Sequence, residues 1–261
     1  VRTDVPKFSA NLSFLYPELP FLERFAAAAA DGFKAVEYAV PYVAKAEELA
    51  ALNAAYGLEQ ALFNCPPGNW DGGERGLATF PARRAEFEAS IDTTLTYAEA
   101  TGVKRLHLMA GIARHDDAAA KAAYESAILF ACDKAQPAGL DIVIEPINPR
   151  DVPGYFLNNF DVAAETVKRL NRPNLKLQFD IYHRQIIHGD VIRGLEAMMP
   201  IIGHIQTASV PGRNEPGTGE LDDARVFATL DRLDYKGFVG CEYRPAGETR
   251  AGLTWFTRAR A

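Results

Sequence analysis

The sequence has few cysteines and no long apolar run. Its 261 residues include 3 cysteines, Cys65, Cys132 and Cys241, which lie far apart and form no C-x-x-C pair. This pattern supports neither a disulfide framework nor a structural zinc site. No apolar stretch is long enough to span a membrane, and the chain opens on no signal-peptide pattern. We therefore expect a cytoplasmic protein that has no membrane partner.

A basic surface is also missing. The chain has 28 Lys and Arg residues against 34 Asp and Glu residues, which gives a formal net charge of −6. Binding to a nucleic-acid backbone requires clustered basic residues, and here these residues are scattered among acidic ones, so we expect no nucleic-acid partner. A negatively charged protein can still bind a small-molecule acid where a metal ion or one arginine sets the local potential.

The chain instead carries a regular alternation of strand and helix patterns. Hydrophobic residues make up 48% and charged residues 24% of the sequence, as in an ordinary globular protein. Alternation of this kind predicts βαβ units and a parallel sheet. The predicted strands are 8–14, 35–40, 58–64, 103–109, 141–147, 175–181, 201–207 and 238–243. The predicted helices are 19–30, 44–56, 82–100, 118–136, 160–170, 185–198 and 222–233.

Eight strands in about 250 residues are typical of a (β/α)8 barrel. The alternative is an open α/β sheet, but no G-x-G-x-x-G motif follows the first strand and no Walker-type loop occurs. We predict a single barrel domain over residues 1–261. An apolar helix face could pack internally or against a second copy, so a homo-oligomer remains open.

Four polar residues lie within the last three positions of consecutive predicted strands, on the face where barrels of this kind place their active sites. They are Glu145, Asp180, Gln206 and Glu242. Three carboxylates and an amide oxygen form a hard ligand set that suits Mg²⁺ or Mn²⁺ better than zinc. Each residue alone could equally be a helix cap or a solvated strand end. The three carboxylates together would repel one another without a cation, so we predict a divalent-metal site.

Other polar residues are expected near the same face. His183 follows Asp180 by three residues and is predicted to lie in a substrate loop, although a capping histidine is the alternative. His107 lies toward the end of the fourth predicted strand and Glu37 toward the end of the second, so both are expected to point toward the same face. Asn64 ends the third strand and is a weaker candidate for a role at this face. For His107 and Glu37, a structural polar group is an equal alternative.

Two long irregular segments follow strands on this face. Residues 65–80 carry Trp70 and Arg75, and residues 210–220 carry Arg213. Long βα loops commonly act as lids or binding loops. Either arginine could pair with a substrate carboxylate through bidentate hydrogen bonds, and a solvated loop arginine is the alternative. We predict that these residues, with His183 and His107, bind the substrate.

Several motifs together resemble the hydroxypyruvate isomerase family of xylose-isomerase-like TIM barrels, in order over nearly the whole chain. The main motifs are VIEPIN at 143–148, FDIYH at 179–183, GHIQ at 203–206 and GCEY at 240–243. The likeness extends to GERG at 73–76, DVPGYFLN at 151–158, PGR at 211–213 and EPGTGE at 215–220.

The resemblance implies an aldose–ketose type isomerase that interconverts hydroxypyruvate and 2-hydroxy-3-oxopropanoate (tartronate semialdehyde). It implies that Glu145 and Glu242 are the proton donor and acceptor, and that Asp180 and Gln206 complete the metal site. Such a reaction would pass through a metal-stabilised cis-enediolate, with the metal as Lewis acid. Relatives that act on 2-oxo-tetronate, one carbon longer, have similar motifs.

Other activities of this fold are alternatives. Ketose 3-epimerases share the architecture but usually carry histidine where this chain has Gln206. DNA-repair endonucleases of the same fold use a histidine-rich trinuclear zinc site. This chain has only 5 histidines, and Asn64 and Gln206 stand where that site would need imidazoles. A non-enzymatic sugar-binding or regulatory protein would bind metal without turnover.

Overall fold

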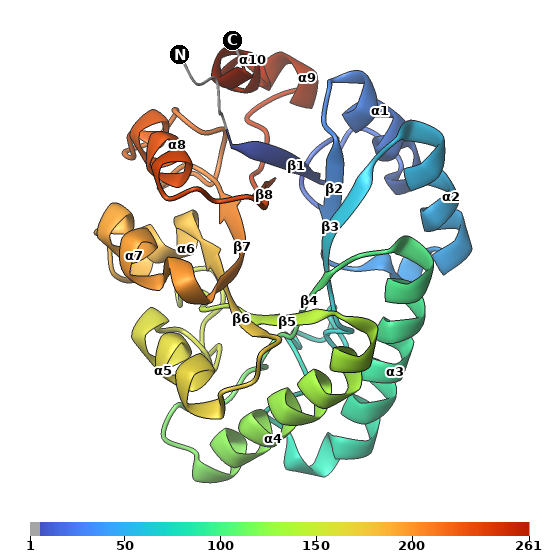
Figure 1. Cartoon of the computed structure of the whole chain (residues 1–261), viewed down its shortest axis with the longest axis vertical. Helices are drawn as coiled ribbons and strands as arrows, with labels where there is room; N and C mark the ends of the chain where they lie inside the picture. The colour runs from blue at the N-terminus through green and yellow to red at the C-terminus, as the bar shows by residue number, and fades with distance from the viewer. Residues whose placement is uncertain (1–5, 261) are drawn as a thin grey trace.

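The computed structural model describes residues 6–260 and contains a closed barrel of eight parallel strands in the order β1 to β8. The strands form the centre of the molecule and the helices surround them (Figure 1). The barrel class is therefore confirmed; residues 1–5 and 261 of the predicted domain lie outside the described residues. The strands are β1 (Lys7–Asn11), β2 (Ala35–Tyr38), β3 (Glu59–Asn64), β4 (Arg105–His107), β5 (Asp141–Ile144), β6 (Leu175–Asp180), β7 (Ile202–Thr207) and β8 (Phe238–Cys241).

The helices cover the outside of the barrel, and side-chain caps fix where several of them begin. The Asp117 side chain accepts hydrogen bonds from the backbone N–H groups of Ala119 and Ala120, and Asn159 caps the next helix in the same way. The α-helices are α1 (Arg24–Ala30), α2 (Ala46–Tyr56), α3 (Arg84–Thr101), α4 (Ala118–Ala135), α5 (Phe160–Leu170), α6 (Ile181–Ile187), α7 (Val191–Met198), α8 (Asp223–Arg232), α9 (Thr249–Gly252) and α10 (Thr254–Arg260).

One predicted helix and one predicted loop are wrong. The segment expected as a single helix over 185–198 forms α6 and α7, separated at Gly189 and Asp190, whose φ values are 61° and 45°. These left-handed conformations end an α-helix. Helix α6 already begins at Ile181 because the Asp180 side chain accepts a hydrogen bond from the Tyr182 backbone N–H. His183 therefore lies in the first turn of a helix and not in a loop.

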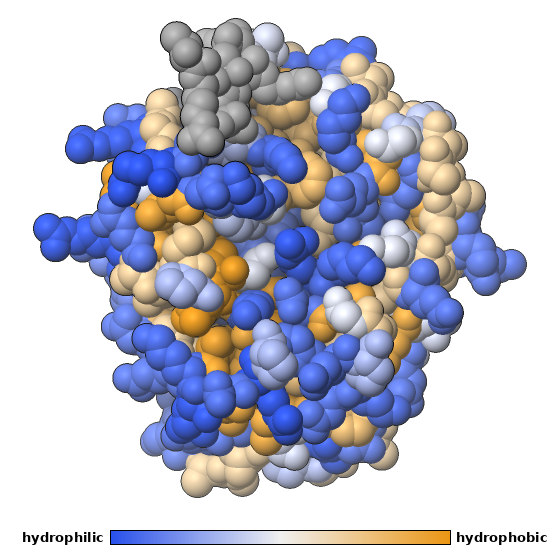
Figure 2. All heavy atoms as spheres, viewed as in Figure 1, coloured by the Kyte–Doolittle hydropathy of each residue, from blue (hydrophilic) through white to orange (hydrophobic). Residues whose placement is uncertain are grey.

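Strand register brings the polar strand ends to one level. Asp180 in β6 pairs with Gln206 in β7, and Gln206 pairs with Gly240 in β8. Side chains alternate along a strand, so Glu242, two residues after Gly240, is expected on the same side as its neighbours. Hydrophilic side chains cover the centre of the face shown in Figure 2. None of the helices within residues 6–260 is both long and apolar enough to cross a membrane.

Candidate active site

A cavity of about 660 Å³ lies where the strands end. Its wall includes Asn64 and His107, the last residues of β3 and β4, and Glu145 and Glu242, which directly follow β5 and β8. A second cavity of about 700 Å³, beside α8 and α9, is lined by part of the EPGTGE motif but by none of the predicted catalytic, metal-binding or substrate-binding residues. The strand-end cavity is therefore the candidate active site.

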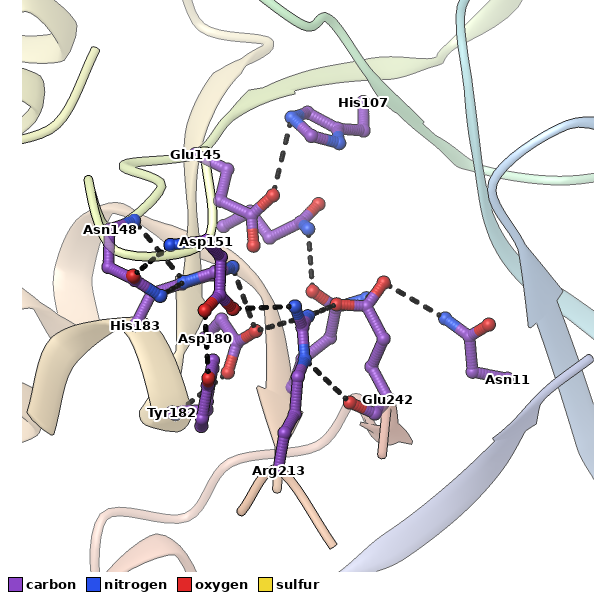
Figure 3. A network of polar contacts seen from close by, with 12 residues as sticks. Asn11, His107, Glu145, Asn148, Asp151, Asp180, Tyr182, His183, Arg213 and Glu242 are labelled. Carbon is purple, nitrogen blue, oxygen red and sulfur yellow. Dashed lines mark hydrogen bonds and ion pairs between the residues drawn. The ribbon is translucent and has the colours of Figure 1, made fainter. Parts of the chain in front are cut away.

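Three carboxyl groups and one imidazole meet in this cavity (Figure 3). One potential ligand atom from each of Glu145, Asp180, His183 and Glu242 lies within 4.8 Å of the others. Glu145 Oε1 and Asp180 Oδ2 are buried and accept no hydrogen bond from the described residues. Buried acceptors without a donor are costly, and a divalent cation would satisfy both oxygens. The donor set therefore fits a metal ion that prefers oxygen ligands.

The electrostatics of the cluster favour a bound positive charge. Burial, followed by repulsion from Glu242 and Asp180, raises the pKa of Glu145 well above its usual value. Burial raises the pKa of Glu242 to about 8 although Arg213 opposes this change, and it raises the pKa of Asp180 to about 6. Like charges at this spacing disfavour ionisation of all three groups. A cation would let all three ionise at neutral pH.

Arg213 already supplies one positive charge inside the site. Its guanidinium lies 2.5 Å from Glu242 Oε2, 3.3 Å from Asp151 Oδ2 and 3.7 Å from Asp180 Oδ2. The guanidinium also makes two cation–π contacts. Its carbon lies 4.9 Å from the centroid of the Phe14 ring and 4.7 Å from that of the Tyr182 ring. The structure thus pairs Arg213 with carboxylates of the chain itself. Its predicted pairing with a substrate carboxylate stays a prediction.

Gln206 lies beside the cluster with its amide held at both ends. Its Nε2 donates to Glu37 Oε1 at 2.8 Å and to Glu242 Oε1 at 3.2 Å. Its Oε1 accepts from Gln178 Nε2 at 2.7 Å. The oxygen predicted to bind the metal therefore points away from Glu242 and toward Gln178, and it keeps a second lone pair.

Glu37 lies on β2, fully buried beneath these residues. Burial alone would raise the pKa of Glu37, but His204 and hydrogen bonds from Gln206 and Ser9 outweigh that effect and lower the pKa. Glu37 therefore remains a carboxylate, and it is not one of the four clustered side chains.

The imidazole of His183 is held as a neutral hydrogen-bond donor. Its Nδ1 lies 3.3 Å from the backbone N of Asn148, which donates to it, and 2.7 Å from Asn148 Nδ2. Burial, with Arg213 and His107 adding to it, lowers the pKa of His183 well below its usual value. A neutral ring that accepts at Nδ1 carries its proton on Nε2. That N–H lies 3.6 Å from Asp180 Oδ2, at the site.

His107 lies on the opposite side of Glu145 and is also neutral. Its Nε2 is 3.6 Å from Glu145 Oε2. Burial lowers the pKa of His107 to about 3, with a further contribution from His204. Nε2 is buried and has no hydrogen-bond partner among the described residues, so it is available to a substrate oxygen.

The loop after β3 forms one wall of the cavity through Trp70 and Arg75. The Arg75 guanidinium carbon lies 3.6 Å from the centroid of the Trp70 ring, a cation–π contact. Arg75 Nη1 also donates to the backbone carbonyls of Trp70 and Glu74, at 3.0 and 2.6 Å. Trp70 remains 44% exposed. No carboxylate among the described residues pairs with Arg75, so its charge is available to an anionic ligand.

Sequence reasoning missed three residues of the site. Asn11 Nδ2 donates to Glu242 Oε1 at 3.2 Å. The sequence predicts that the first strand ends at Phe14, so Asn11 is not selected by the strand-end criterion, which picks polar residues at the ends of predicted strands. Asp151 pairs with Arg213, and its place in the DVPGYFLN motif was the available signal. Arg244 lines the cavity, two residues after Glu242, and nothing in the local sequence distinguishes it from other exposed arginines.

The chain matches the family model described as xylose isomerase-like TIM barrel over residues 25–259. It is 51% identical over 253 residues to a 2-oxo-tetronate isomerase of Cupriavidus necator, and the match covers 96% of this chain and 97% of the relative. It is 44% identical over 260 residues to a Homo sapiens protein named "Putative hydroxypyruvate isomerase", with 95% and 93% of the two chains covered.

A solved structure from Brucella melitensis superimposes with a TM-score of 0.95 at 43% identity, and the match covers 98% of this chain and 100% of the other. That protein is named AP endonuclease, family 2. A D-allulose 3-epimerase from Methylomonas has a TM-score of 0.75 at only 20% identity, which shows a shared fold alone.

Proposed function

The chain belongs to the xylose isomerase-like TIM barrel family and is an isomerase, and we propose that it interconverts hydroxypyruvate and 2-hydroxy-3-oxopropanoate. The observation that carries this proposal is the group of three carboxyl side chains, Glu145, Asp180 and Glu242, with ligand atoms within 4.8 Å of one another beside a cavity for a small molecule. Isomerisation of a 2-oxo acid needs both a charge to stabilise an enediolate and groups that move a proton between adjacent carbons.

The residues proposed to hold a divalent cation are Glu145, Asp180, Gln206 and Glu242. All four offer oxygen atoms, so Mg²⁺ or Mn²⁺ is the proposed ion. Bound there, the ion would supply Lewis-acid stabilisation of the negative charge that develops on the substrate oxygens. The hydrogen-bond-free oxygens of Glu145 and Asp180 support this assignment.

Glu145 and Glu242 are proposed to transfer the proton. They follow β5 and β8 and both face the cavity, so one can take a proton from one carbon while the other returns it to the neighbouring carbon. General acid–base catalysis of this kind contributes about 10²–10⁴ in rate. The neutral Nε2–H of His183 would donate to a substrate oxygen, and His107 would contact a second one.

The remaining proposed roles concern the acid group of the substrate and the exclusion of water. Trp70 and Arg75 line one wall of the cavity, and we propose that this loop limits the access of water. Arg75 is proposed to bind the substrate carboxylate, because its guanidinium has no carboxylate partner in the described chain. Arg213 would hold Glu242 and Asp180 in place through its ion pairs.

A 2-oxo-tetronate is the second candidate substrate. One observation favours it: the 51% identical relative carries that name. The chemistry would be the same, with the carbonyl moving between C2 and C3. Arg244, exposed at the cavity wall, would reach the longer substrate.

The endonuclease alternative rests on the name of the Brucella melitensis protein. A trinuclear zinc site would need several clustered histidines. Only His183 joins the acidic cluster in the described residues, and His204 is committed to Glu37 at 2.8 Å. The net charge of −6 also opposes binding to DNA. These observations favour the isomerase.

Substitution of the two glutamates tests the proposal. Glu145→Gln and Glu242→Gln keep side-chain size but remove the ionisable group, so each should lower kcat on hydroxypyruvate or 2-oxo-tetronate by at least about 10². Glu165→Gln, an exposed glutamate of α5, is the matched control and should retain full activity. A folded Glu145→Gln or Glu242→Gln enzyme with near wild-type kcat would remove that residue from proton transfer.

A further inference from the structure

The side chain of Glu37 extends from β2 into the interior of the barrel, where it contacts residues of β1 and β7. Its carboxylate accepts four hydrogen bonds. Ser9 Oγ and His204 Nε2 lie 2.8 Å from Oε2, and Asn11 Nδ2 and Gln206 Nε2 lie 3.1 and 2.8 Å from Oε1. Glu37 is fully buried, and so are its four partners. Four hydrogen bonds to one buried carboxylate hold the Glu37 side chain in a single position.

The barrel also leaves space for this carboxylate. Gly240 of β8 faces it, and a Cβ atom at that position would come within 2.2 Å of Glu37 Oε1. Any larger residue at 240 would therefore displace Glu37. The glycine is required by the side chain opposite it and not by its own backbone conformation.

Two of the four partners continue to the candidate active site. Asn11 Nδ2 and Gln206 Nε2 each lie 3.2 Å from Glu242 Oε1. Each amide nitrogen thus bridges Glu37 on one side and Glu242 on the other. A primary amide has two N–H donors on one atom, which is what a bridge between two carboxylates needs.

The bridge determines which end of each amide faces Glu242. If the Gln206 amide were rotated by 180°, its oxygen would lie against the oxygens of both carboxylates, and its nitrogen would face the donor Nε2 of Gln178. Glu37 therefore excludes that orientation. The oxygen of Gln206 is left facing Gln178, from which it accepts a hydrogen bond.

We propose that Glu37 is a positioning residue for the isomerase reaction. It orients Asn11 and Gln206 so that both amide nitrogens donate to Oε1 of Glu242. Glu242 is then fixed through Oε1, and its Oε2, next to Arg213, remains for the cation or the transferred proton. This inference rests on the proposed function for the role of Glu242 and the cation.

The test is Glu37→Gln in the full chain, with Mn²⁺ as the probe. Groups that orient metal ligands typically contribute about 10- to 100-fold in metal affinity or activity. We expect Mn²⁺ affinity, measured by electron paramagnetic resonance of free Mn²⁺, to fall by about that factor. In the isomerase assay kcat should fall while KM changes little, because Glu37 does not face the substrate cavity.

Two further variants separate positioning from general stability. Asn174→Ala removes a buried amide that donates to the carbonyls of Cys132 and Leu140, at 2.9 and 3.0 Å, before β6. It should lower Tm and leave Mn²⁺ affinity and kcat unchanged. If Glu37→Gln does not fold, Gly240→Ala displaces the same carboxylate without changing a polar group, and it should weaken Mn²⁺ binding.

Wild-type Mn²⁺ affinity and kcat in folded Glu37→Gln or Gly240→Ala would overturn the inference. So would an equal loss of Mn²⁺ affinity in Asn174→Ala, because the effect would then follow stability alone. If the wild-type chain binds Mn²⁺ but converts no 2-oxo acid, the proposed function fails and the affinity comparison still decides the role of Glu37.

Discussion

Replacement of Arg213 should destabilise the protein strongly, and added metal should reverse the loss. Arg213 is 9% exposed and lies among three carboxylates, with contacts of 2.5 to 3.7 Å. Arg213→Met keeps the length of the side chain but removes its charge. Removal of one partner from a buried ion pair costs about 3–5 kcal/mol. For a chain of this size, 1 kcal/mol corresponds to roughly 2–4 °C in Tm, so we expect Tm to fall by roughly 6–20 °C.

The loss should depend on metal and on pH. A cation that binds the folded state stabilises it by about 2.7 kcal/mol at 100 times its Kd, so Mg²⁺ or Mn²⁺ should restore much of the Tm of Arg213→Met and raise that of the wild type less. The raised pKa values of Glu242, about 8, and Asp180, about 6, mean that both carboxyls become charged as the pH rises. Without Arg213 their repulsion grows in that direction, so the loss should be larger at pH 8.5 than at pH 6.

Thermal unfolding in EDTA, and then with saturating Mg²⁺, measures both effects. Arg244→Met is the matched control, because Arg244 is exposed and its guanidinium has no partner in the described chain. It should change stability by less than about 0.5 kcal/mol. An Arg213→Met protein as stable as the wild type in EDTA would refute the assignment of Arg213 as the internal counter-ion of this cluster.

Three other results are expected. Arg75→Ala should raise KM more than it lowers kcat if the arginine binds only the substrate carboxylate; steady-state kinetics with the reversed pattern would indicate a transition-state role. Asn148→Ala should lower kcat, because His183 Nδ1 then loses the closer of its two donors and keeps only the backbone N–H at 3.3 Å; an unchanged kcat would show that the Asn148 side chain is not needed to hold the His183 proton on Nε2. Burial raises the pKa of Asp223 from 3.8 to about 6, so the folded state binds this proton more tightly and loses stability as the pH rises from about 4 to about 6. Asp223→Asn should therefore be more stable than the wild type above pH 6, by up to about 3 kcal/mol, and urea unfolding with no gain at pH 8 would contradict this reasoning.

The barrel was predictable because each strand is a short buried run followed by an amphipathic or alanine-rich helix. The strand-end criterion then selected Glu145, Asp180, Gln206 and Glu242, since position along a parallel strand determines which face of the barrel a residue occupies. Side-chain orientation was not predictable in this way. The sequence does not indicate that the nitrogen of Gln206 faces Glu242, because Glu37, on a strand far away in sequence, decides it.

The errors have local physical causes. The sequence pattern places Asp180 at a strand end followed by a loop, but the same carboxylate caps helix α6 and so carries His183 into a helix. Asn11 escapes the strand-end criterion because apolar residues continue beyond the end of β1. The sequence pattern suggests a substrate contact for Arg213, although its neighbours in space include Asp151, Asp180 and Glu242, three acidic residues from three different βα loops or strand ends.

The most direct test of the central claim is turnover by the purified protein with EDTA or with added Mg²⁺ or Mn²⁺. Hydroxypyruvate, 2-oxo-tetronate and a free ketose such as fructose would be compared in parallel. We predict metal-dependent isomerisation of a 2-oxo acid, with hydroxypyruvate or 2-oxo-tetronate converted far faster than the ketose. Conversion of the ketose alone, or no conversion of any of the three with metal present, would contradict the account.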